Sequence, residues 1–271
     1  MAWQIERRDR RSIPHSVLVG TAHFFPRHFR RELRALVAGA RVVVLEGPLD
    51  EPAAQKVLEA GRGSGGAELY RQARDRIHAH LGIYCAPLDL NQMLRDLVFG
   101  RQDEWLEEEL RKLKPWAAFF GIWTRWRARE GWEHKMDLDA AAIAGRLGKE
   151  VRYLESIEEQ IAALEAVPVE RFFRFMNESW LQYNAAYERH YLAGDLDALA
   201  DAAQAFPTYC EPVIERRDPL LASRMADELE RGGACVVIGV AHCRGVLAHL
   251  ARQGFEIKEI KGSGPLYSLY S

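Results

Sequence analysis

The sequence has no long apolar run and no excess of charge of either sign. Its longest apolar stretch, Trp116–Trp123, is far shorter than the roughly 20 residues that a membrane-spanning helix needs. No apolar segment of the secretory-signal type follows Met1. The formal net charge is −2 over 271 residues, which gives no electrostatic reason for a nucleic-acid partner. We therefore expect a cytoplasmic protein with no membrane span and no nucleic-acid partner.

The sequence also has few cysteines and lacks several well-known catalytic signatures. Its four cysteines form no CxxC pair and have no zinc-finger spacing, so we expect reduced thiols. The absence of GxSxG argues against a serine hydrolase with a nucleophile elbow, and the absence of HExxH argues against a zincin. The segment Gly61–Gly66 (GRGSGG) formally contains GxGxxG. It follows a helix-like segment and not a strand, so it predicts a loop and not a dinucleotide site.

Two nearly identical stretches, by contrast, lie at opposite ends of the chain. They are Val17–His23 (VLVGTAH) and Val236–His242 (VVIGVAH). Each is followed by a segment with helical spacing and then by a second apolar run, which is Arg41–Gly47 in one case and Phe255–Ile260 in the other. This pattern predicts a β-α-β unit that is used twice, with a histidine at the end of the first strand each time.

The remaining periodicity predicts an α/β fold. Val42–Leu45 is an unalternating apolar run, as expected for a strand of a parallel sheet that is covered on both faces. We predict a mainly parallel sheet built from the two β-α-β repeats, with a large helical insertion that forms a cap. The chain is expected to be one domain over 1–271. Its core comes from 15–52, 83–90, 150–155 and 234–261, and its helical cap mainly from 91–148 and 157–230.

Finer expectations concern single elements. Trp3–Glu6 is predicted to be an edge strand, Ile83–Leu88 a further strand, and the first helix is expected to start at Pro26. The segment Asn91–Arg129 carries aromatic residues at helical spacing, which predicts packed core and not a membrane or ligand groove. Another long helix is expected over Val169–Leu192.

Three chemically active residues follow the predicted strands. His23 and His242 end the two repeated strands, and Glu46 comes directly after Val42–Leu45. The carboxyl ends of parallel strands meet at one edge, where open α/β sheets place their ligands. Two imidazoles and a carboxylate are a suitable ligand set for a catalytic divalent metal with open positions for water. The alternative is that these histidines make structural hydrogen bonds only.

The segment Glu215–Asp218 (ERRD) supplies a fourth candidate. Arg217 could clamp a substrate carboxylate or hold Glu46 through bidentate hydrogen bonds. It could equally be a surface ion-pair partner. Asp218, followed by Pro219, is predicted to be the N-cap of the next helix.

Taken together, these motifs resemble the TraB/GumN family. The similarity rests on GTAH, VVVLEGP, the ERRD arginine motif and GVAH followed by RGVLAHLARQGFEI. This family includes the animal Tiki proteins, and the resemblance implies a core related to the ChaN and erythromycin-esterase proteins. From its Tiki branch it implies a metal-dependent protease supported by Mn²⁺ or Co²⁺, with Zn²⁺ also possible. The matching positions here are His23, Glu46 and His242.

Three functions remain open from the sequence. The first is a metal-dependent, peptidase-like hydrolase that uses His23, Glu46, His242 and Arg217 on a peptide or small-molecule substrate. The second is a metal-independent, esterase-like hydrolase in which a histidine oriented by Glu46 activates water. The third is a non-enzymatic protein that binds a peptide, haem or metal. No oligomeric state is predicted.

Overall fold

A computed structural model describes residues 1–7, 13–81 and 107–260 of the chain. It contains a sheet of six strands in the order β4-β3-β5-β2-β1-β6. The pairs β4-β3, β3-β5 and β5-β2 are parallel, whereas β1 is antiparallel to both β2 and β6. The bounds are β1 Ala2–Arg7, β2 Ser16–Thr21, β3 Val42–Leu45, β4 Glu150–Tyr153, β5 Ala234–Gly239 and β6 Phe255–Glu259.

The centre of the sheet is made of the apolar runs that the sequence singles out. Every residue of β2, β3 and β5 is buried, because helices cover both faces of the sheet. The strand β5 lies between β2 and β3 and pairs with both. The two predicted β-α-β units, β2-α1-β3 and β5-α12-β6, are therefore interlocked, with α1 at Arg30–Gly39 and α12 at Val240–Arg252. The mainly parallel α/β sheet is confirmed.

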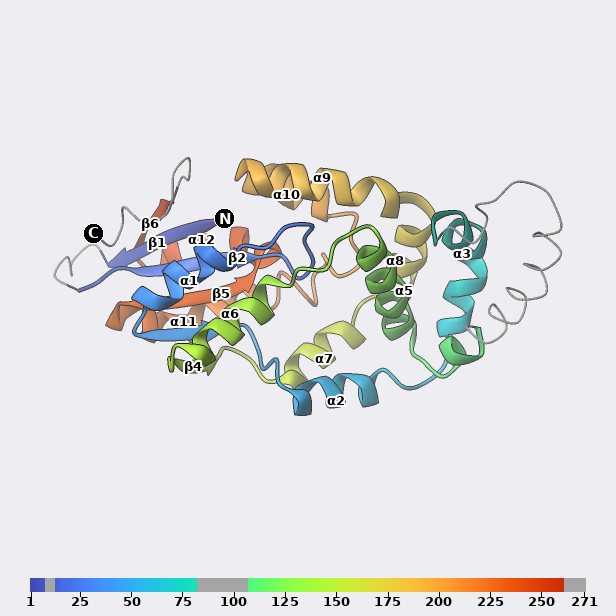
Figure 1. Cartoon of the computed structure of the whole chain (residues 1–271), viewed down its shortest axis with the longest axis horizontal. Coiled ribbons are helices and arrows are strands. Elements are labelled where there is room, and N and C mark those ends of the chain that lie inside the picture. The colour runs from blue at the N-terminus through green and yellow to red at the C-terminus, as the bar shows by residue number, and fades with distance from the viewer. Residues whose placement is uncertain (8–12, 82–106, 261–271) are drawn as a thin grey trace.

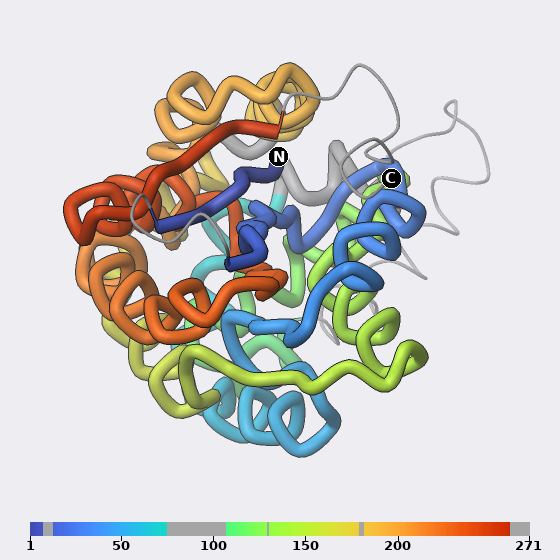
Figure 2. The backbone as a smooth tube through the Cα atoms, turned by 90° about the vertical axis from the view of Figure 1, so that its left-hand side faces the viewer, coloured from blue at the N-terminus to red at the C-terminus, as the bar shows by residue number. Residues whose placement is uncertain are grey.

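The helices around the sheet form two layers. The helices α1 and α6 (Met136–Arg146) pack together on one face, and α11 (Asp218–Arg231) and α12 pack together on the other. Figure 2 shows the sheet strands between these two pairs. Both layers belong to one cluster of buried apolar residues that also contains the strands. The sheet thus has a conventional covered core.

Further helices lie beyond the carboxyl ends of the strands, toward the right of Figure 1. They are α2 Glu51–Ala60, α3 Gly66–Leu81, α5 Pro115–Arg129, α7 Ile157–Glu165, α8 Val169–Arg174, the π-helical turn η1 Phe175–Ser179, α9 Trp180–Ala193 and α10 Leu196–Ala203. A second buried cluster connects α3, α5, α7, α8 and η1 and includes Trp116, Phe119, Trp123 and Trp126 of α5. Tyr191 of α9 and Leu199 of α10 belong to the cluster of the sheet instead. This part of the aromatic stripe is buried core, as predicted, but Phe120 and Trp123 also line the cavity described below, which corrects the expectation that the stripe forms no ligand groove. The helical insertion is confirmed.

Several finer expectations need correction. The strand β1 is not an edge strand, because β6 pairs with its far side. The helix α1 begins at Arg30 and not at Pro26, since Phe25 is bridged to His134 by backbone hydrogen bonds. A π-helical turn interrupts the single helix expected over 169–192. The helices α6 and α11 pack on the sheet, although they fall within the ranges expected for the cap.

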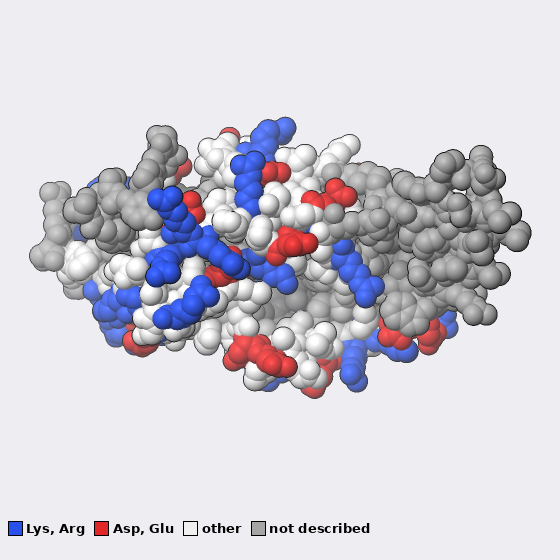
Figure 3. Space-filling view, viewed as in Figure 1, with Lys and Arg blue, Asp and Glu red and all other residues white. Residues whose placement is uncertain are grey.

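Some expectations lie outside the described residues. These are the predicted strand at 83–88 and the first part of the helical stretch at 91–129, up to residue 106. Gly61–Gly66 connects α2 to α3 and is a loop, as predicted. Within the part of the chain that the structure describes, no helix is long and apolar enough to cross a membrane. On the face drawn in Figure 3, basic and acidic side chains lie among one another.

Candidate active site

Three neighbouring strand ends build the site. Because β5 lies between β2 and β3, the residues that follow these strands are neighbours in space although they are far apart in sequence. His23 follows β2 in a loop, and Glu46 follows β3, where its backbone N–H donates to the carbonyl of Val237 over 3.1 Å. His242 is the third residue of α12 and not the last residue of a strand, which corrects the expectation that each repeat ends its strand in histidine.

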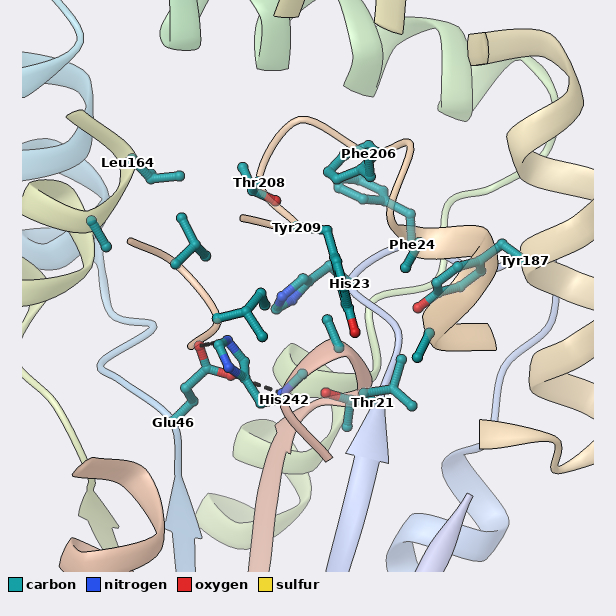
Figure 4. A pocket seen from close by; sticks show the side chains of 18 of the residues that line it. Thr21, His23, Phe24, Glu46, Leu164, Tyr187, Phe206, Thr208, Tyr209 and His242 are labelled. Carbon is teal, nitrogen blue, oxygen red and sulfur yellow. Dashed lines mark hydrogen bonds and ion pairs between the residues drawn. The ribbon is translucent and has the colours of Figure 1, made fainter. Parts of the chain in front are cut away.

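The three predicted side chains converge on Gly239, the last residue of β5. A methyl group added to its Cα would lie 3.3 Å from Oε2 of Glu46 and 3.4 Å from Nε2 of His23. It would also lie 3.7 Å from Cδ2 of His242. Figure 4 shows the two imidazoles and the carboxylate next to one another above the strand ends. Glycine at this position leaves the space that the three groups surround.

Each histidine is held by an aspartate through its Nδ1 nitrogen. Nδ1 of His23 is 2.5 Å from Oδ2 of Asp137, and Nδ1 of His242 is 2.7 Å from Oδ1 of Asp218. A carboxylate on Nδ1 fixes the tautomer and leaves Nε2 as the nitrogen that faces the site. The same arrangement orients metal-binding histidines in many proteins. Both histidines therefore direct Nε2 toward the site.

Arg217, the fourth predicted residue, bridges the other members of the site. Its Nη2 donates to Oε1 of Glu46 over 2.6 Å, and its Nη1 lies 3.3 Å from Nε2 of His242. The same guanidinium forms a two-point contact with Glu155, in which Nε is 2.9 Å from Oε2. Only 11% of the Arg217 side chain is exposed, so the interpretation as a surface ion-pair partner is wrong.

The prediction that Asp218 caps its helix is also wrong. The helix α11 begins at Asp218 itself, Arg217 stands at the N-cap position, and no side chain caps the helix there. The Asp218 carboxylate instead contacts His242 and is 7% exposed. Burial raises the pKa of Asp218, and the contact with His242 opposes this rise.

The charges of the site shift the pKa values of its members. Burial alone would raise the pKa of Glu46, but the charges of His242, Arg217 and His23 outweigh burial and lower it to about 2. The charge of Asp137 and its hydrogen bond raise the pKa of His23 to about 9. Burial would lower the pKa of Arg217, but its hydrogen bonds and ion pairs with Glu155 and Glu46 raise it further. At neutral pH, Glu46 is therefore a carboxylate. His23 is protonated on both ring nitrogens, and a metal ion would have to replace the proton on Nε2.

The donor set is chemically suitable for a divalent metal, but Arg217 contacts two of its members. Among the described residues, no group of three or more His, Cys, Asp or Glu side chains is arranged to hold an ion. Oε1 of Glu46 and Nε2 of His242 both face the guanidinium. Two imidazoles that are each supported by a carboxylate, together with one ionised glutamate, suit an ion such as Mn²⁺, Co²⁺ or Zn²⁺. The chemistry of these residues therefore fits a metal, although in this structure Arg217 contacts two of the donor atoms and the side chains are not arranged around an ion.

Two members of the site were not predicted from the sequence. Glu155 follows β4 and is 4% exposed beside Arg217. Its position repeats that of Glu46, because both neighbouring strands lead into a Leu-Glu pair. These pairs are Leu45–Glu46 at the end of β3 and Leu154–Glu155 after β4. That repetition is a signal that could have identified it. Asp137 lies in the first turn of α6, and nothing in the local sequence places it beside His23.

A cavity of about 340 Å³ opens above these residues. Its floor includes His23, Glu46, His242 and Arg217. Its walls are mainly apolar or aromatic and come from α5, α7, α9, α10 and the segment before α11. Leu164, Phe206, Tyr209 and Tyr187 surround the floor in Figure 4. The size lies within the range of cavities that bind small molecules.

Comparison with known proteins gives one match. A search of curated proteins and a search of solved structures found no significant similarity. The profile of the TraB/PrgY/gumN family matches residues 1–259, which include every member of the site described above. The chain belongs to the TraB/PrgY/gumN family.

Proposed function

We propose that the protein is a metal-dependent hydrolase of peptide or amide bonds. One observation carries this proposal. The histidines of both repeats direct Nε2 toward the space beside Glu46, and each has an aspartate on its other ring nitrogen. His23, Glu46 and His242 would hold the ion, and the family resemblance favours Mn²⁺ or Co²⁺. The bound ion would lower the pKa of a water molecule and polarise the substrate carbonyl.

The other members of the site have supporting roles in this proposal. Asp137 and Asp218 keep the imidazoles oriented. Arg217 retains Glu155 as a partner when Glu46 turns to the ion. Its charge is then available for the oxygen on which negative charge develops during hydrolysis.

A specific contact favours a second candidate function. Nε2 of His242 lies 3.3 Å from Nη1 of Arg217, so the nitrogen that would bind an ion already has a cationic neighbour. In a metal-independent hydrolase, Arg217 would remain in this place. His23, which is more exposed than His242, would then serve as the base that activates water, and this activity would increase with pH toward the His23 pKa of about 9, because only the neutral imidazole can accept a proton.

Metal content together with turnover distinguishes these functions. Protein purified without chelators should contain about one Mn, Co or Zn per chain by elemental analysis, and it should cleave members of a peptide library. A strong chelator should abolish cleavage, and Mn²⁺ or Co²⁺ should restore it. His23→Ala and His242→Ala should lose the metal, whereas His28→Ala should keep it, because His28 is exposed and does not line the cavity.

The opposite results are equally informative. Full-rate cleavage by chelated, metal-free protein would contradict the proposal and support the metal-independent hydrolase. Retained metal without cleavage of any peptide or ester would leave a binding protein as the function.

A further inference from the structure

A buried arginine without an acidic partner lies in the wall of the cavity. Arg127, on α5, is 3% exposed and lines the cavity together with the four site residues. None of the described Asp or Glu side chains forms an ion pair with it. Burying a charge is costly unless an opposite charge compensates for it. Such a residue therefore needs an explanation.

The protein contacts of Arg127 are all with neutral groups. Nη1 donates to the Asn184 side chain, and Nη2 donates to the carbonyl of Phe24 over 2.8 Å. The guanidinium carbon lies 3.6 Å from the ring centre of Trp132 and 5.2 Å from that of Trp123. The Nε–H has no hydrogen-bond partner among the described residues. These contacts orient the guanidinium but leave its positive charge uncompensated.

The other charged groups that line the cavity are already paired. Arg217 contacts Glu46 and Glu155, and His23 contacts Asp137. Burial lowers the pKa of Arg127 to about 10, so it is still a cation at neutral pH. The cavity therefore offers one unpaired positive charge within mainly apolar and aromatic walls.

We propose that the cavity binds a compact ligand with an apolar or aromatic body and a single carboxylate, and that Arg127 recognises this carboxylate. A planar guanidinium is well suited to a carboxylate. Phe206, Tyr209 and Leu199 would contact the apolar body. Since Arg127 binds the carbonyl of Phe24, the residue next to His23, the carboxylate would lie close to the reacting groups. This inference deepens the proposed function, because it names the class of substrate for the same site.

The carboxylate could belong to a free organic acid or to the C-terminus of a short peptide. Two matched pairs of compounds test both sources. The first pair is 4-phenylbutyrate and 4-phenylbutyramide, and the second is N-acetyl-Ala-Phe with a free or an amidated C-terminus. Binding is measured by calorimetry on chelated protein, because a carboxylate could otherwise bind a metal ion. We expect the acid of at least one pair to bind at least 10-fold more tightly than its amide. The pair that shows the preference identifies the source.

Two variants assign this preference to Arg127. Arg127→Gln should reduce the acid-to-amide ratio to within about 2-fold while the amide binds as before. Arg125→Gln is the matched control, since Arg125 lies two residues away on the same helix and is exposed. It should leave the ratio unchanged. Thermal melting checks that each variant is folded. If Arg127→Gln does not fold, Arg127→Lys replaces it and should keep only part of the preference.

Equal affinity of acid and amide for the wild-type protein in both pairs would overturn the inference. An unchanged preference in Arg127→Gln would overturn it as well. Because these measurements need neither metal nor turnover, their outcome is separate from that of the hydrolysis test. A protein that prefers the acids but never cleaves a substrate would keep this inference and lose the proposed function.

Discussion

The two GxxH repeats have almost the same residues but end in different structures. After β2, the chain forms a loop, and the side chain of His23 is 67% exposed at the floor of the cavity. After β5, the chain enters α12 at once, and the side chain of His242 is 5% exposed. The motif therefore brings a histidine to the sheet edge in both cases, but it does not determine how open that histidine is.

The residues that follow each motif explain the difference. In the first repeat, Pro26 comes three residues after His23, and a proline disfavours helical backbone in the residue before it. Backbone hydrogen bonds between Phe25 and His134 then hold this segment outside any helix. In the second repeat, His242 is followed by CRGVLAHLAR, which contains no proline and places apolar residues at helical spacing. The site thus has an open half around His23 and a buried half around His242.

Among the predicted changes, loss of Arg217 should lower the free energy of unfolding most, and the loss arises in the buried half of the site. Arg217→Met leaves the carboxylates of Glu46 and Glu155 without their cation, and both are at most 15% exposed. Breaking such a buried pair costs about 3–5 kcal/mol of unfolding free energy. Added Mn²⁺ should recover part of this loss, because an ion would supply the missing positive charge. Urea denaturation with and without Mn²⁺ measures both effects.

The neighbouring residue provides a control for this variant. The exposed Arg216 pairs with the exposed Glu211, so Arg216→Met should cost less than about 1 kcal/mol. Equal costs for the two variants would show that the charge network around Arg217 does not stabilise the fold.

The two histidines should differ in stability more than in metal binding. His242→Ala removes the partner of the buried Asp218 carboxylate and should cost about 2–3 kcal/mol. His23→Ala should cost less than about 1 kcal/mol, because its side chain is mostly exposed and Asp137 keeps the hydroxyl of Thr21 as a partner. Both variants should lose the metal. Urea denaturation of the chelated proteins gives the two costs, and similar costs would contradict the division into an open and a buried half.

Substitutions of the motif glycines Gly239 and Gly20 should separate metal binding from stability. Gly239→Ala places a methyl group among the three proposed ligands and should weaken metal binding at least 10-fold, while the backbone at φ −55° accepts alanine without strain. Gly20→Ala places its methyl group 2.8 Å from the sulfur of Cys243, inside the core. It should cost about 1–3 kcal/mol and leave metal affinity unchanged. Calorimetric titration with Mn²⁺ measures metal affinity, and urea denaturation measures stability. Gly239→Ala should mainly lose metal affinity, whereas Gly20→Ala should mainly lose stability.

Much of this site follows from the sequence because it depends on strand ends. The apolar runs predict β2, β3 and β5, and the parallel sheet then brings His23, Glu46 and His242 together. Asp137 could not be predicted, since its place beside His23 depends on how α6 packs against the sheet. The contact of Asp218 with His242 was also missed, because the capping preference of aspartate at the start of α11 competes there with a tertiary contact. The helical start of α12 at Val240 was missed as well.

The interlocked strands also have a consequence for biosynthesis. Among the described residues, the strands β2 and β3 have no hydrogen bonds with each other and are joined in the sheet through β5, which is synthesised long after both. A nascent chain that lacks β5 can still pair β1 with β2 and β3 with β4, but no strand then joins these two pairs to bring His23 and Glu46 together. Contacts between such distant segments form late in folding, since the intervening chain loses much entropy when the segments meet. Reactive groups in this arrangement are assembled only after β5 has been synthesised, so a nascent chain that still lacks β5 has no working site with which to act on its surroundings.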